Sequence, residues 1–86
     1  MKEGTHFIDH DSGAWVKGIN QLVPNLREGQ FLYIRKDKAD GYQKRKYKIH
    51  QIETFIGDTT DMVLQDVTVI DLGIVEEVRN RKEDGV

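Results

Sequence analysis

The chain has 86 residues, of which 37% are hydrophobic and 33% charged, with a formal net charge of −2 and no cysteine. This length fits one domain with a small core, and the hydrophobic content is too high for a disordered chain. The lack of cysteine excludes disulfide bonds, thiolate catalysis and cysteine-ligated zinc, and no segment approaches the roughly 18 apolar residues of a membrane-spanning helix. The polar N-terminus has no signal-peptide pattern, so we expect a cytoplasmic protein without a membrane partner.

The N-terminal part of the chain divides into a polar segment and an apolar stripe. Residues 1–13 surround the pair Phe7-Ile8 with glycines, histidines and charges, which indicates an arm or one short strand. Apolar residues then follow at helical spacing, namely Trp15, Val16, Ile19, Leu22 and Val23. We therefore predict an amphipathic helix over residues 14–23, capped by Asp11 or Ser12 and ended by Pro24.

The sequence after Pro24 is typical of β structure. Residues 31–34 form an apolar and aromatic run, and residues 36–41 predict a turn in which Gly41 supplies a positive φ. On a regular strand, Tyr47 and Ile49 would point to one face and Ile52 and Ile56 to the other. This change of face predicts a bulge or bend near residues 50–51. A second turn is expected at residues 57–61, and further strands are expected over residues 62–78, with an interruption at Gly73. Residues 79–86 are expected to form a frayed polar tail.

These elements predict a mainly β (α+β) fold in which residues 14–78 form a single domain. One helix and four or five short, bent strands suit a small, curved antiparallel β-barrel of the SH3/Sm-like or OB-like type. The alternative is an open antiparallel sheet with the helix on one face.

The order of these elements resembles that of the Sm and Hfq-like barrels. The resemblance is carried by Gly29-Gln30-Phe31 after the helix, by Met62-Val63-Leu64-Gln65-Asp66-Val67, and by Leu72-Gly73-Ile74-Val75 before Arg79-Asn80. It implies a barrel whose loops ring a pore and bind single-stranded RNA. Arg45-Lys46-Tyr47 lacks the glycine of that family's second strand, so no RNA-pocket residue is assigned from the resemblance.

Charge is divided unevenly along the chain. Residues 35–48 have a local net charge of +5, whereas residues 49–78 contain seven carboxylates and no lysine or arginine. This division predicts a polarised surface with a basic face for an anion.

The basic segment is the main candidate for a binding site, because its cations would neutralise phosphates and its tyrosines would stack on unpaired bases. The candidate polyanion-binding residues are Arg35, Lys36, Lys38, Tyr42, Lys44, Arg45, Lys46, Tyr47 and Lys48. On a strand, the even-numbered residues 42–48 would share one face and Arg45 and Tyr47 the other. The alternative is a solvated edge hairpin whose cations prevent aggregation or pair with the acidic strands.

Trp15, Val16 and Ile19 form a second candidate surface. If the strands form a closed barrel without the helix, these apolar side chains are left to bind a partner or a second copy of the chain. If the helix packs on the strands, they belong to the core.

The sequence offers little for catalysis or metal binding. His6 and His10 with Asp9 and Asp11 would suit a divalent ion on a helix, but no helical pattern supports that spacing. We therefore predict no catalytic residue, no metal and no cofactor, with a metal-assisted hydrolase as the remote alternative.

Together these features predict a small non-enzymatic protein that binds nucleic acid or another polyanion through residues 35–48. The alternative is a protein–protein interaction module, such as an oligomeric adaptor or inhibitor, with a composition that also occurs in proteins of phages and mobile elements.

Overall fold

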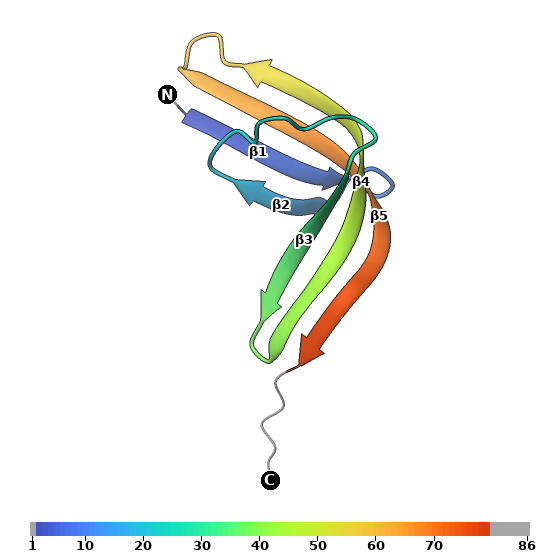
Figure 1. Cartoon of the computed structure of the whole chain (residues 1–86). Coiled ribbons are helices and arrows are strands. Elements are labelled where there is room, and N and C mark those ends of the chain that lie inside the picture. Colours follow the sequence, from blue (N-terminus) through green and yellow to red (C-terminus); the bar gives the residue numbers. More distant parts are fainter. Residues whose placement is uncertain (1, 80–86) are drawn as a thin grey trace.

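A computed structural model describes residues 2–79 of the chain, and these residues form one five-stranded sheet without a helix (Figure 1). The strands are β1 (Lys2–Asp9), β2 (Trp15–Ile19), β3 (Phe31–Lys38), β4 (Gly41–Ile56) and β5 (Met62–Arg79). Their order is β2-β1-β5-β4-β3, with β1 and β5 parallel and the other neighbours antiparallel.

The mainly β prediction is confirmed, whereas two finer features of the expected fold are not found. Among the described residues, β2 and β3 are unpaired edges, so the sheet is open and does not close into a barrel. The pairing of β1 with β5 also makes the sheet mixed, not purely antiparallel. Of the expected tail, Arg79 ends β5, and residues 80–86 lie outside the described residues.

The predicted helix over residues 14–23 is wrong, because residues 15–19 are strand β2. The pairing of β1 with β2 shifts register between Phe7 and Ile8, which leaves Val16 as an extra residue on β2. This bulge allows both Val16 and Ile19 to pack against the core, although their spacing does not fit a regular strand. The bulge thus gave the apolar residues of a strand the spacing expected for a helix. In addition, a ten-residue helix containing Gly18 would have been only marginally stable in water.

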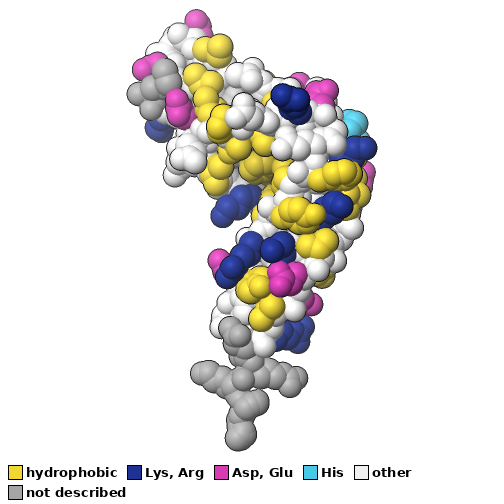
Figure 2. All heavy atoms as spheres, viewed as in Figure 1, with side chains coloured by type: hydrophobic (Ala, Val, Ile, Leu, Met, Phe, Trp, Pro, Cys, Tyr) yellow, Lys and Arg dark blue, Asp and Glu magenta, His cyan; other side chains and the backbone are white. Residues whose placement is uncertain are grey.

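Strands β4 and β5 are long and change direction along their length, so the sheet has two parts (Figure 1). The upper sheet consists of β1, β2, residues 49–56 of β4 and residues 62–69 of β5. The arm consists of β3, residues 41–48 of β4 and residues 70–79 of β5. The register shifts between Ile49 and Gln51, which confirms the bulge expected at residues 50–51, and it shifts again on both sides of Arg45. The result is an elongated molecule of 58 × 27 × 24 Å (Figure 2).

Turns form at both predicted places, but the first is shorter than the predicted range of residues 36–41, because residues 36–38 belong to β3. Ala39 and Asp40 connect β3 to β4, and Gly41 follows with a φ of 146°, where a side chain is strongly disfavoured. Residues 57–61 connect β4 to β5, and the Gly57 amide donates a hydrogen bond to the Met62 carbonyl at 2.8 Å.

The core lies where the upper sheet meets the arm and is small. Its buried apolar side chains among residues 2–79 are Phe7, Tyr47, Ile49, Val67 and Val69. Thr5 is also fully buried, and its hydroxyl donates a hydrogen bond to the Gln21 carbonyl at 2.8 Å, which anchors the segment after β2. Because so few side chains are fully buried, each of them should contribute heavily to stability.

Candidate binding surfaces

The predicted basic segment forms the β3–β4 hairpin of the arm, and its register separates the side chains onto two faces. Leu32 and Ile34 pack against the core and define the inner face. On the opposite face, hereafter the outer face of the arm, β3 residues lie across from β4 lysines in three pairs: Phe31 with Lys48, Tyr33 with Lys46, and Arg35 with Lys44. Tyr42 lies on the same face, as the strand alternation predicted.

Two exposed aromatic rings stand on this outer face. Phe31 and Tyr33 are 50% and 57% exposed. Sequence reasoning assigned both to an apolar strand and did not consider them as binding residues. The sequence did contain a sign of their exposure, because Phe31 and Tyr33 alternate with Leu32 and Ile34. On a strand this alternation places the two rings on one face and the two aliphatic side chains on the other.

Cations lie directly over rings on the outer face. The Lys46 ammonium lies 4.4 Å from the centroid of the Phe31 ring, and the Arg35 guanidinium lies 4.0 Å from that of Tyr42. Such cation–π contacts hold cations and aromatic surfaces together. The outer face therefore offers both kinds of group within one small area.

Tyr47, a predicted polyanion-binding residue, belongs instead to the core. Only 6% of its surface is exposed, so its ring cannot stack on a ligand. Burial, and then the Asp71 carboxylate, raise the pKa of its phenol above the ordinary value of 10.0. The position follows from the register, which places Tyr47 opposite Leu32 on the inner face.

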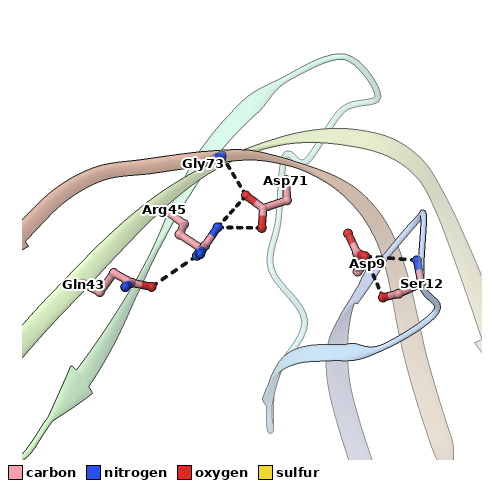
Figure 3. A network of polar contacts seen from close by, with 6 residues as sticks. All are labelled: Asp9, Ser12, Gln43, Arg45, Asp71 and Gly73. Carbon is pink, nitrogen blue, oxygen red and sulfur yellow. Dashed lines mark hydrogen bonds and ion pairs between the residues drawn. The ribbon is translucent and has the colours of Figure 1, made fainter.

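Arg45, another predicted site residue, takes part in a structural network (Figure 3). Its Nη1 donates to both carboxylate oxygens of Asp71, at 2.8 and 3.1 Å, and its Nε donates to the Gln43 side chain at 3.2 Å. Asp71 also accepts a hydrogen bond of 2.7 Å from the Gly73 amide. Gly73 has a φ of 101°, so this network holds the bulged segment of β5 in place.

Several other cations of the arm form ion pairs with the acidic block. Lys44 lies 3.2 Å from Glu76, and Lys38 lies 3.7 Å from Glu77. The hydrogen bond and the charge of Lys44 lower the pKa of the Glu76 carboxyl. Because the fold places β4 beside β5, several cations of the basic segment pair with carboxylates of the acidic segment. This agrees with the alternative interpretation, in which the cations pair with the acidic strands.

Three lysines of the basic segment remain without an ion pair to any described residue. Lys46 and Lys48 lie on the outer face, beside Tyr33 and Phe31. Lys36 lies on the inner face, opposite Gln43. The predicted site residues are therefore divided between two faces and do not form one surface.

The second predicted surface, Trp15 with Val16 and Ile19, is also divided. Val16 and Ile19 pack against the core, whereas Trp15 is 61% exposed. The Trp15 indole covers Gly18, where an added Cβ would lie 2.3 Å from the ring, and its centroid is 4.7 Å from that of His6. Of these three side chains only Trp15 is exposed, whereas Val16 and Ile19 are half-buried.

The histidines and carboxylates near the N-terminus do not converge on one point. His6 pairs with Asp66 at 3.3 Å, whereas the His10 ring lies 4.0 Å from that of His50. Asp9 accepts hydrogen bonds from the amide and the hydroxyl of Ser12 (Figure 3). No group of three histidine or acidic side chains within residues 2–79 is placed to hold a metal ion.

Residues 2–79 contain no helix that is long and apolar enough to cross a membrane. Comparisons with protein-family models, with curated proteins and with solved structures gave no match. The function is therefore inferred from the residues of this chain and from their geometry.

Proposed function

We propose that the chain is a non-enzymatic binding protein that binds single-stranded nucleic acid along the outer face of the arm. The observation that carries this proposal is the position of two exposed rings, Phe31 and Tyr33, beside the unpaired Lys46 and Lys48. Aromatic rings bind unpaired bases by stacking, and cations bind the phosphates between them.

The geometry of a strand suits this kind of ligand. Phe31 and Tyr33 are two residues apart on one face, which corresponds to about 7 Å along the strand. They offer two successive stacking positions, while Lys44, Lys46 and Lys48 form a parallel row on the neighbouring strand. Lys44 is shared with Glu76, so Lys46 and Lys48 supply the charge that is available for phosphates.

The test is the affinity for a fluorescein-labelled oligothymidylate of about 12 nucleotides, measured by fluorescence anisotropy at about 50 mM and 500 mM salt. We expect the double substitution Phe31→Ala with Tyr33→Ala to weaken binding at least tenfold, since each stacked base contributes about 1–3 kcal/mol. Lys46→Ala with Lys48→Ala should weaken binding and reduce its dependence on salt.

Phe55 provides the matched control. It is 48% exposed on the upper sheet, so Phe55→Ala removes a comparable ring away from the arm and should leave the affinity unchanged. Failure of the wild-type protein to bind the oligonucleotide, or equal binding by the Phe31/Tyr33 double variant, would contradict the proposal.

A second candidate function is a protein–protein interaction module. The observation that favours it is the pair of unpaired edges, β2 and β3, together with the exposed apolar side chains of residues 2–79. Besides the rings already described, these side chains are Ile56, Leu72, Ile74 and Val75. An interaction module is expected to self-associate or to bind a protein segment.

Light scattering coupled to size-exclusion chromatography gives the first check of this second function. We expect a mass above that of one chain if the module assembles with itself, and a decrease toward the monomer at high salt if opposite charges drive assembly. A protein that stays monomeric and also binds no peptide would contradict the second function.

A further inference from the structure

A hollow lies on the outer face of the arm and is lined by Tyr33, Lys44, Val75 and Glu76. Lys44 is the diagonal neighbour of Tyr33 across the β3–β4 pair, and Glu76 lies directly opposite Lys44 across the β4–β5 pair. The register shift beside Arg45 leaves Val75 as an extra residue on β5. Because of this bulge, Val75 and Glu76 line the same hollow although they are neighbours in the sequence.

The side chains around this hollow are accessible to a ligand. Tyr33 and Val75 are 57% and 49% exposed. The side chains of Lys44 and Glu76 are 39% and 45% exposed. The hollow therefore combines a flat ring and an aliphatic side chain with one cation and one carboxylate.

Lys44 and Glu76 present a hydrogen-bond donor next to an acceptor. The Lys44 Nζ lies 3.2 Å from the Glu76 Oε1. The hydrogen bond and the charge of Lys44, and then a hydrogen bond from Tyr42, lower the pKa of the Glu76 carboxyl, so this group is ionised at neutral pH. An ionised carboxylate has about four lone-pair positions, of which these two partners use two. Glu76 therefore keeps acceptor capacity for a ligand in the hollow.

The four nucleic-acid bases differ in what they offer to a carboxylate. The Watson–Crick edge of guanine has two adjacent donors, N1–H and the N2 amine, beside the O6 acceptor. Adenine and cytosine have one amine beside an acceptor nitrogen, and thymine has one N–H between two carbonyl oxygens. Guanine alone can therefore donate two parallel hydrogen bonds to a carboxylate, whereas each of the other bases places an acceptor against it.

We infer that this hollow binds a guanine base of a single-stranded nucleic acid. The base stacks on Tyr33 and packs against Val75, while the Glu76 carboxylate accepts hydrogen bonds from N1–H and the N2 amine. The Lys44 ammonium donates a hydrogen bond to O6. Phe31 does not line the hollow, so a base that stacks there is not selected. The inference rests on the first of the two proposed functions and names the base that one stacking position prefers.

The probes are fluorescein-labelled thymidine oligomers of about 12 nucleotides, in which one central base is left as thymine or replaced by guanine, hypoxanthine, adenine or cytosine. Their affinities for the wild-type protein are measured by fluorescence anisotropy at about 50 mM salt. We expect the guanine probe to bind about tenfold more tightly than the thymine probe, as for a bidentate base contact. Hypoxanthine keeps N1–H and O6 but lacks the N2 amine, so its probe should lose most of this preference.

Two glutamate variants test whether the hollow is the source of the preference. Glu76→Gln keeps the shape of the side chain but replaces one acceptor oxygen by a donor, so it should bind the guanine and thymine probes equally. Glu77→Gln is the matched control, because it removes the same charge at the next residue of β5. Glu77 lies opposite Gln43 on the inner face, so this variant should keep the tenfold preference. Phe31→Ala should weaken the binding of both probes and leave their ratio unchanged.

Three outcomes would overturn the inference while leaving single-strand binding in place. One is equal affinity of the wild-type protein for the guanine, adenine, cytosine and thymine probes. The second is equal affinity for the guanine and hypoxanthine probes, because the N2 amine would then make no contact. The third is a guanine preference that persists in Glu76→Gln. If the wild-type protein binds none of the probes, the first proposed function fails and the inference fails with it.

Discussion

Replacement of Ile49 by alanine is expected to lower the free energy of unfolding by about 2–5 kcal/mol, the usual range for an isoleucine truncated in a packed core. Ile49 is 1% exposed and lies at the bend of β4, in contact with the small core that joins the upper sheet to the arm. A domain of this length has a stability of roughly 4–13 kcal/mol, and the small core places this chain toward the lower limit. Ile49→Ala should therefore remove a large part of the total stability.

Ile56 is a matched control for this experiment, since it is the same residue type on the same strand but is 78% exposed. Ile56→Ala should change the stability by no more than about 0.5 kcal/mol. Urea denaturation followed by circular dichroism measures both values, and the midpoint should fall for Ile49→Ala only. Similar losses of unfolding free energy in the two variants would show that the core at the bend of β4 is not the main source of stability.

Replacement of Gly41 by alanine is expected to break the pairing between β4 and β5 at the tip of the arm. A Cβ at this position would lie 1.8 Å from the Val78 carbonyl oxygen and 2.9 Å from the Arg79 Cα, in a residue whose φ is 146°. These neighbours are backbone atoms, so no side chain can rotate to relieve the contact. We expect a loss of about 2–3 kcal/mol, limited by local opening of the last strand pairs.

Hydrogen exchange measured by NMR tests this expectation and shows where the opening occurs. The amides around Tyr42 and Val78, which are paired residues, should lose protection, while those of Val67 and Val69 should keep it. Gly29→Ala is the control, because Gly29 also has a positive φ of 86° but no atom lies within 4 Å of an added Cβ. Gly29→Ala should lower the free energy of unfolding only by the backbone penalty of about 1–2 kcal/mol. If the amides at the tip of the arm keep their protection in Gly41→Ala, the steric explanation is wrong.

Local preferences in the sequence were enough to predict several of the strands and turns. Gly41 after Asp40 indicated the hairpin turn, and the change of phase between Ile49 and Ile52 indicated the bulge near residue 50. Alternation within residues 42–48 also predicted which side chains share a face, because that pattern depends only on strand geometry. The same local reasoning failed at residues 15–19, since a bulge at Val16 gave a strand the apolar spacing of a helix.

The order of the strands in the sheet, in contrast, depends on contacts between residues that are far apart in the sequence. The parallel pairing of β1 with β5 joins residues about sixty positions apart, and the pairing of β4 with β5 places Lys44 beside Glu76. These contacts neutralise charges that the sequence shows as two separate blocks, bury Tyr47 and leave a gap between β2 and β3. Such long-range pairing depends on the collective burial of side chains across the sheet, and the pattern within any one segment therefore does not specify it.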